Sequence, residues 1–90
     1  DRGVTKELNG ETSSLPIEVD GRVLLVDLSK QLDVDLTGVA ASTVGGLILE
    51  YSRRFLEKGE GMEYANLRFT VIERDDRRLT KIKIDYASNY

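Results

Sequence analysis

Apolar and polar residues alternate along three stretches in the second half of the chain. The alternation is longest over residues 67–72 and 81–86, and a shorter stretch covers residues 62–64. A period of two residues is typical of strands that bury one face, so each stretch predicts a β-strand. The polar run at residues 75–78, between the two longer stretches, predicts a hairpin turn. The pattern therefore predicts an antiparallel meander.

A short helix is predicted in the first half of the chain. Leu25, Leu28 and Leu32 are spaced as one face of a helix, which predicts a helix over about residues 25–32. The segment 22–26 is also rich in leucine and β-branched residues, so a return strand of a hairpin is the alternative at this position.

A second helix is predicted more clearly, because its apolar residues form a single stripe. Ser42 or Thr43 can cap its start by accepting a hydrogen bond from a backbone N–H of the first turn. Gly59 is expected to end it. The stripe consists of Val44, Leu47, Ile48, Tyr51 and Phe55.

The start of the chain differs in character from the rest. Residues 1–14 are polar and without period, so we interpret them as a linker or flexible tail, followed by one domain over residues 15–90. A strand is predicted over residues 17–19, and Asp20 and Gly21 form a turn signal after it. The predicted fold class is α+β, an antiparallel sheet covered on one face by two helices.

One sequence block carries a resemblance to a known family. It runs from Thr43 through the pair Gly45-Gly46 to Glu50, and is followed by Gly59-Glu60 and by the segment 63–69. Two adjacent glycines at the start of a helix are unusual, because each weakens a helix interior by roughly 1 kcal/mol relative to alanine. This block and the order of elements after it resemble the transporter-associated domain of the CorC/HlyC family, over about residues 17–84.

The resemblance implies a function in a larger protein. In that family the domain is the C-terminal part of hemolysin-like membrane proteins that also carry CBS domains and are linked to magnesium and cobalt efflux. It implies an accessory, regulatory and non-enzymatic domain on the cytoplasmic side of the cell membrane, with the CBS domains and the membrane domain of the parent protein as partners. The family fold is similar to part of the PCMH-type FAD-binding fold. Binding of FAD is possible only by that fold relationship, and no cofactor is expected.

The amino-acid composition limits the catalytic and metal-binding chemistry that the chain can perform. The chain contains neither cysteine nor histidine, which excludes disulfides, thiolate metal sites and the commonest general base. Residues 1–50 hold nine acids and four bases, whereas residues 51–90 hold seven acids and nine bases. No apolar run has the ~20 residues that cross a bilayer, so we expect this fragment to be soluble and any membrane span to lie in another part of a longer protein.

Two groups of residues are candidates for ligand binding. Carboxylates could supply oxygen ligands to a divalent cation, although their spacing matches no calcium loop and solvated turn residues are the favoured interpretation. These acids are Asp20, Asp27, Asp33 and Asp35. Gly45 and Gly46 could present backbone N–H groups to a phosphate or other cofactor, but the sequence lacks the spacing of a nucleotide-binding motif, so we favour a packing role.

Basic residues around the last predicted hairpin are candidates for partner docking. A solvated sheet face, neutralised by the acids among them, is the favoured interpretation, and docking onto an acidic partner or anionic lipid comes second. The candidates are Arg74, Arg77, Arg78, Lys81 and Lys83. No nucleic acid is expected, because the net charge is −3 and exposed aromatics are not interleaved with the bases. Self-association stays open as an alternative, and so does a small module that binds flavin, nucleotide or a divalent cation.

The glycine pair generates a testable prediction. If Gly45 or Gly46 lies against a neighbouring backbone, a β-carbon has no room there, and alanine lowers stability despite its better helix propensity. We expect both Gly45→Ala and Gly46→Ala to lower the melting temperature. Higher melting temperatures for both variants would contradict the close-packing explanation.

Overall fold

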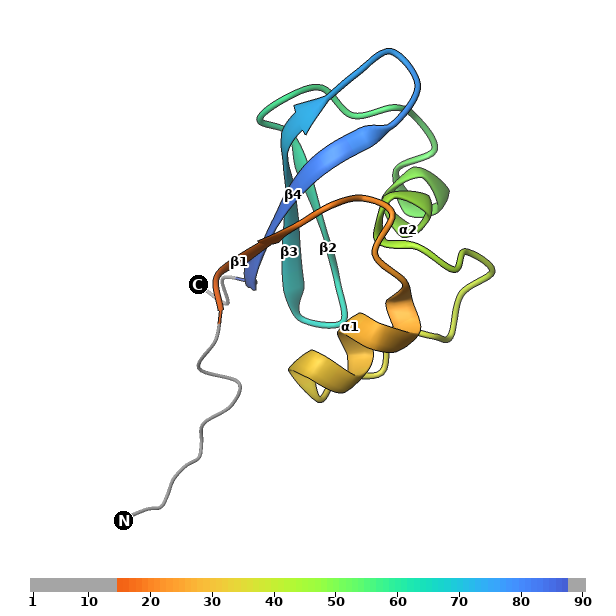
Figure 1. The fold of residues 1–90 in the computed structure, drawn as a ribbon, viewed down its shortest axis with the longest axis vertical. Helices are drawn as coiled ribbons and strands as arrows, with labels where there is room; N and C mark the ends of the chain where they lie inside the picture. Colours follow the sequence, from red (N-terminus) through yellow and green to blue (C-terminus); the bar gives the residue numbers. More distant parts are fainter. Residues whose placement is uncertain (1–14, 88–90) are drawn as a thin grey trace.

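The computed structural model describes residues 15–87, so the predicted tail at residues 1–14 lies outside the described residues. Within residues 15–87 the fold is α+β, as predicted (Figure 1). Its elements are β1 (Ile17–Val19), α1 (Leu25–Leu32), α2 (Val44–Ser52), β2 (Gly61–Tyr64), β3 (Leu67–Arg74) and β4 (Leu79–Tyr86).

The strands form one antiparallel sheet in the order β1-β4-β3-β2 (Figure 1). β2, β3 and β4 follow one another as the predicted meander. β1 pairs with the opposite side of β4, with Ile17 across from Ile84 and Val19 across from Ile82. The first strand of the chain is therefore a neighbour of the last.

The hydrophobic core lies between one face of the sheet and the two helices. Phe69 and Val71 of β3 and Ile82 and Ile84 of β4 are completely buried there. They belong to one cluster with buried residues of α1 and α2. Burial of each such side chain contributes about 1.5–3 kcal/mol relative to exposure, so this two-layer contact is the main stabilising element of the fold. The other face of the sheet carries the polar residues of the alternating pattern.

Helix α1 has the bounds that the sequence predicts, and the hairpin alternative for this segment is wrong. Leu25, Leu28 and Leu32 are at most 2% exposed, which shows that the leucine spacing reports a buried helical face. The helix ends at Asp33, whose φ of 56° lies in the left-handed region. Beyond it, the Leu36 N–H donates to Ser29 Oγ at 2.9 Å, and this bond turns Leu36 back into the core.

Helix α2 begins as predicted but ends earlier. Thr43 caps it, since its Oγ1 accepts a hydrogen bond from the Gly46 N–H at 3.1 Å. The helix stops at Ser52, because Arg53 adopts φ 61° and donates its N–H to Leu49 O. The prediction that the helix continues through Phe55 to Gly59 is therefore wrong.

The early end of α2 changes the role of the residues that follow it. In the left-handed conformation of Arg53 the chain leaves the helix axis, and Leu56 enters the core at 3% exposure. Phe55 packs outside the helix beneath the guanidinium of Arg74, which lies 3.9 Å from the ring centroid. Tyr51, a member of the predicted apolar stripe, is 48% exposed and contacts Tyr64 with ring centroids 4.8 Å apart.

Two glycines lie directly against neighbouring backbone. A β-carbon on Gly21 would overlap the carbonyl oxygen of Leu79 at the start of β4. On its other side, Gly21 O accepts the N–H of Gly45 at 2.8 Å, and a β-carbon on Gly45 would lie only 3.1 Å from the same oxygen. This confirms that one glycine of the pair lies against a neighbouring backbone. Gly46 instead faces the side chains of Ala41 and Thr43.

The contact at Gly21 predicts a strong effect of substitution. Gly21→Ala pushes a methyl group into a backbone carbonyl that the sheet holds in place, and overpacking of this kind costs about 1–3 kcal/mol or more. We expect a fall of several degrees in the melting temperature, measured by thermal unfolding with circular dichroism.

Gly38→Ala is the matched control for that prediction. A β-carbon on Gly38 would meet only the hydroxyl of Tyr64 at 4.0 Å, so this variant should keep or slightly raise the melting temperature. Equal melting temperatures for the Gly21 and Gly38 variants would contradict the role of the Gly21 contact.

Candidate functional site

The start of α2 offers no unpaired backbone donor to a ligand. Val44 donates its N–H to Val23 O at 3.0 Å, Gly45 to Gly21 O at 2.8 Å and Gly46 to the Thr43 hydroxyl at 3.1 Å. A phosphate at a helix N-terminus needs such N–H groups free. The two candidate cofactor-binding glycines therefore serve the packing of α2 against the Gly21 turn.

A depression of about 240 Å³ lies beside this contact. Gly21, Gly45 and Gly46 leave part of its surface without side chains, and Leu49 and Leu79 make the remainder largely apolar. Arg22, Thr43 and Arg78 complete its lining. The surface of the depression is therefore mainly apolar.

The four candidate metal-binding acids are separated by the fold. Asp20 follows β1, and its Oδ1 accepts the Arg22 N–H at 2.8 Å, which is the main cause of a lowered pKa of that carboxyl. Asp27 lies in the first turn of α1, and Asp33 ends that helix.

The fourth of these acids, Asp35, caps its own turn. Its Oδ1 accepts the hydroxyl of Thr37 at 2.7 Å and the N–H of Thr37 at 2.9 Å. The hydroxyl is the first cause of a lowered pKa of the Asp35 carboxyl. Asp33 and Asp35 border one shallow depression, but no group of three or more acids suited to a metal ion occurs within residues 15–87.

The five basic candidates do not share one face, contrary to the sequence interpretation. Lys81 and Lys83 lie on the polar side of β4. Lys81 is across from Glu73 of β3, and Lys83 is across from Thr70 of β3 and Glu18 of β1. Arg77 is exposed in the turn between β3 and β4. Arg74 and Arg78 face other parts of the molecule.

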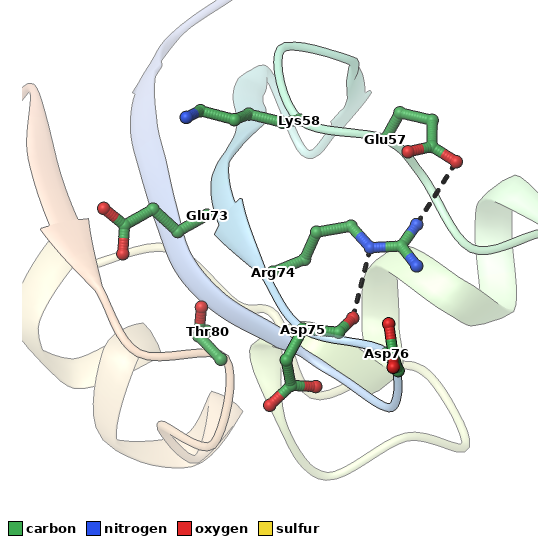
Figure 2. A pocket seen from close by; sticks show the side chains of 7 residues that line it. All are labelled: Glu57, Lys58, Glu73, Arg74, Asp75, Asp76 and Thr80. Carbon is green, nitrogen blue, oxygen red and sulfur yellow. Dashed lines mark hydrogen bonds and ion pairs between the residues drawn. The ribbon is translucent and has the colours of Figure 1, made fainter.

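Arg74 is fixed within the domain (Figure 2). Its Nη1 lies 3.2 Å from Leu56 O and 3.4 Å from a carboxylate oxygen of Glu57, and its Nε donates to Asp75 O at 3.2 Å. With its guanidinium also over the ring of Phe55, the side chain is only 21% exposed. The residue therefore connects the end of β3 to the segment after α2.

Figure 2 also shows the open depression around Arg74, which has a volume of about 470 Å³. Four carboxylates line it together with Lys58, Thr80 and the arginine itself. The side chains of Glu73 and Lys58 point away from the Arg74 guanidinium, so the acids do not converge on one point. These carboxylates belong to Glu57, Glu73, Asp75 and Asp76.

The turn between β3 and β4 is stabilised by one carboxylate. Asp75 Oδ1 accepts the N–H groups of Arg77 and Arg78 at 2.8 and 2.9 Å, and these bonds lower the pKa of the Asp75 carboxyl. The Asp75 N–H donates to Arg78 O at 3.0 Å and closes the turn. The predicted hairpin at residues 75–78 is therefore confirmed.

The polar face of the sheet is electrically balanced. Arg68 lies across from Asp85 and forms an ion pair of 3.2 Å with Glu63 of β2. Lys81 and Lys83 each lie across from a glutamate as well. Each of these three bases of the polar face therefore has an acid beside it. Exposed pairs of this kind contribute only about 0–1 kcal/mol each to stability. They give the face no strong field of either sign.

Sequence reasoning missed an apolar surface next to α1. Leu24 and Val26 are 45% and 47% exposed, and with Ala41 they line a depression of about 330 Å³. Leu24 also forms an isolated bridge with Thr43, which binds the segment before α1 to the segment before α2. The sequence contained the pattern that predicts this surface, because Leu24 and Val26 lie off the face made by the buried leucines of α1.

The chain matches one known protein family. The family model described as the transporter associated domain, CorC_HlyC, matches residues 13–87, a range that includes every helix and strand of the structure. Among curated protein sequences, none matches significantly. No helix in the described part of the chain has the length and apolar character that a membrane span requires.

Solved bacterial structures have the same fold. A conserved protein of unknown function from Haemophilus influenzae Rd KW20 is 30% identical, with a TM-score of 0.71 over 77% of this chain and 85% of that one. The transporter-associated domain of a CBS domain protein from Porphyromonas gingivalis is 28% identical, with a TM-score of 0.69 over 79% and 87%. A third, from a Xylella fastidiosa Temecula1 hemolysin in complex with Mg++ and Mn++, is 21% identical with a TM-score of 0.69 over 79% and 86%, a likeness that shows the fold alone.

An ion pair between Arg54 and Glu60 predicts a pH dependence of stability. Arg54 Nη1 and Nη2 donate to the two oxygens of Glu60 at 2.9 and 2.7 Å, and this contact, with the Glu57 N–H second, lowers the pKa of the Glu60 carboxyl from 4.5 to about 2. Because the folded-state pKa is the lower one, the contribution is complete above pH 4.5 and is lost as the pH falls toward 2.

We therefore expect Glu60→Gln to reduce the loss of melting temperature between about pH 5 and pH 2. Arg54→Gln removes the other partner and should reproduce the effect. Thermal unfolding at a series of pH values measures it. An acid-induced loss as steep in both variants as in the unsubstituted chain would contradict the assignment.

Proposed function

The chain belongs to the family of CorC_HlyC transporter-associated domains, and on this premise we propose that it is an accessory, regulatory domain of a membrane ion transporter. It acts by binding to other parts of the parent protein and thereby modulates transport, without catalysing a reaction itself. The observation that carries the proposal is the extent of the match, since residues 13–87 span the whole folded unit and not an isolated motif.

The parent protein in this proposal carries CBS domains. The Porphyromonas gingivalis relative, at 28% identity, is part of a CBS domain protein, and this supports the same neighbours for the present domain. The transported ion is magnesium or cobalt, as in the efflux proteins and hemolysins with which the family is linked. The domain then lies on the cytoplasmic side of the membrane, beside the CBS domains.

The surface of the domain supports a binding function. Its core side chains are used internally, and within residues 15–87 the polar sheet face, the hairpin turn and two partly apolar depressions are available for contacts with a partner. Of the basic candidates, Arg77, Lys81 and Lys83 remain available for an acidic surface or anionic lipid, whereas Arg74 is held by Leu56 and Glu57.

A small ligand-binding module is the second candidate function. The depression lined by Arg22 and Arg78 suits a divalent cation poorly, because no carboxylate is among its lining residues. Flavin would be recognised by its yellow colour after purification. A nucleotide or a cation would raise the melting temperature with increasing concentration.

Removal of the domain from the parent protein tests the proposed function. We expect the transporter without residues 15–87 to insert in the membrane and to transport ions, but with altered regulation. Allosteric couplings typically change affinity by about 5-fold or more, so we expect a shift of this size in the ion concentration for half-maximal flux. Flux into or out of proteoliposomes that contain magnesium or cobalt measures it.

Gly38→Ala in the intact parent is the control, since this substitution should leave the domain folded and the flux unchanged. Identical flux curves for the intact and shortened proteins, at equal amounts in the membrane, would contradict a regulatory role.

A further inference from the structure

We propose that the apolar depression beside α1 binds a peptide segment in which aliphatic side chains are flanked by lysine or arginine. This deepens the proposed function, on which it rests, because it names the surface and the chemistry through which another segment of the parent protein would contact the domain. Three observations support it: two exposed aliphatic side chains, a helix start without a capping side chain, and unpaired carboxylates at the rim.

The depression is formed by the segments that lead into the two helices. It has a volume of about 330 Å³, and each side chain that lines it is aliphatic or carries only a hydroxyl group. Leu24 and Val26 are 45% and 47% exposed, although Leu25 between them is buried in the core. The lining therefore suits an aliphatic side chain. It consists of Leu24, Leu25, Val26, Thr37, Ala41 and Ser42.

Leucine is an unfavourable residue at the start of α1 for the isolated domain. Leu24 occupies the N-cap position in an extended conformation, with φ −74° and ψ 138°, and its side chain makes no capping hydrogen bond. Serine, threonine, aspartate and asparagine are strongly preferred here, because their side chains accept an N–H of the first turn. Leu24 thus neither caps the helix nor enters the core. Departures of this kind from local preference are expected at functional surfaces.

Two carboxylates are bound to backbone groups of the lining. Glu50 Oε1 accepts the Ala41 N–H at 3.0 Å, and Asp35 Oδ1 accepts the Thr37 N–H at 2.9 Å. These bonds hold the two carboxylates at the rim of the depression. Neither acid forms an ion pair within residues 15–87, so each carboxylate keeps an oxygen for a cationic group of a partner.

The charged groups around the depression are mainly acidic, since four acids and two bases give a net charge of −2. The nearer base, Lys30, lies one turn beyond Val26 in α1. Arg22, two residues before Leu24, is instead paired with Asp20 at 3.4 Å. A negative surface attracts a basic segment and repels anionic lipid. The six residues are Asp27, Asp33, Asp35, Glu50, Lys30 and Arg53.

The test uses the 90-residue chain and the blocked peptide acetyl-Lys-Leu-Leu-Lys-amide. We expect saturable shifts in the methyl NMR signals of Leu24, Val26 and Ala41. Acetyl-Gln-Leu-Leu-Gln-amide is the uncharged control and should bind about fivefold more weakly, because exposed ion pairs are individually weak. Acetyl-Lys-Ser-Ser-Lys-amide keeps the charges but lacks the aliphatic groups, and it should bind about tenfold or more weakly.

Leu24→Ser separates the effect on binding from the effect on stability. Serine can cap α1 from this position, so the variant should keep or raise the melting temperature, whereas loss of the aliphatic side chain should weaken peptide binding about tenfold. Val26→Gln has the better helix propensity and should likewise lose binding without losing stability. It keeps the test valid if Leu24→Ser does not fold.

Two further variants distinguish the rim from general charge attraction. Asp35→Asn keeps the acceptor oxygen for Thr37 but removes the charge, and it should weaken binding of the lysine peptide about twofold to fivefold. Asp76→Asn makes the same change in the exposed turn between β3 and β4, at the opposite end of the domain from α1 (Figure 1). This matched control should leave binding unchanged.

Several outcomes would overturn the inference. Equal binding of the lysine and glutamine peptides would exclude the carboxylates, and unchanged binding by Leu24→Ser and Val26→Gln would exclude the depression. Equal losses from Asp35→Asn and Asp76→Asn would show general charge attraction. Shifts of the same methyl signals that grow with chain concentration in the absence of peptide would show a second copy as the occupant. If no peptide binds but removal of the domain alters the flux of the parent protein, this inference is wrong while the regulatory function stands.

Discussion

The contact in which Gly21 lies between Leu79 and Gly45 constrains the rest of the structure. It joins the turn after β1, the start of α2 and the start of β4, three segments that are distant in sequence. Backbone atoms can approach so closely only where no side chain intervenes. Because this contact fixes the position of α2 over the sheet, it also determines where the core residues Val44, Leu47 and Ile48 meet the strands. It also brings Arg22 and Arg78 to the same depression.

Local patterns in the sequence predicted most of the fold, because the period of the apolar residues decides helix or strand before any tertiary contact is known. The leucines of α1 and the alternation in β3 and β4 are examples: α1 has the predicted bounds, and each of the two strands extends two residues further toward the hairpin turn than the pattern predicts. The end of α2 was not predictable in this way. Arg53 adopts a left-handed conformation without being glycine or asparagine, and the burial of Leu56 depends on a core that the local pattern does not describe.

The site was harder to predict than the fold, because it depends on the register between strands. The pairing of β3 with β4 is irregular between Val71 and Arg74, and such an irregularity changes the face on which the following residues lie. Arg74 consequently pairs across from the buried Leu79 and packs over Phe55, instead of joining Lys81 on the polar face. The glycine pair was recognisable as a packing feature from sequence, whereas its partner Gly21 was read only as a turn residue.

The pairing of β1 with β4 determines how the domain responds to mechanical load. Ile17 is across from Ile84, so the polypeptide enters and leaves the folded unit side by side. Tension applied through both ends therefore separates the antiparallel ladder from its open end, one hydrogen-bonded pair after another, instead of shearing all pairs together. β1 has only three residues to pair with β4, whereas β4 is also held by its longer ladder with β3. Tension through both ends of the domain is thus borne first by the short β1–β4 ladder, which includes the core residues Ile82 and Ile84.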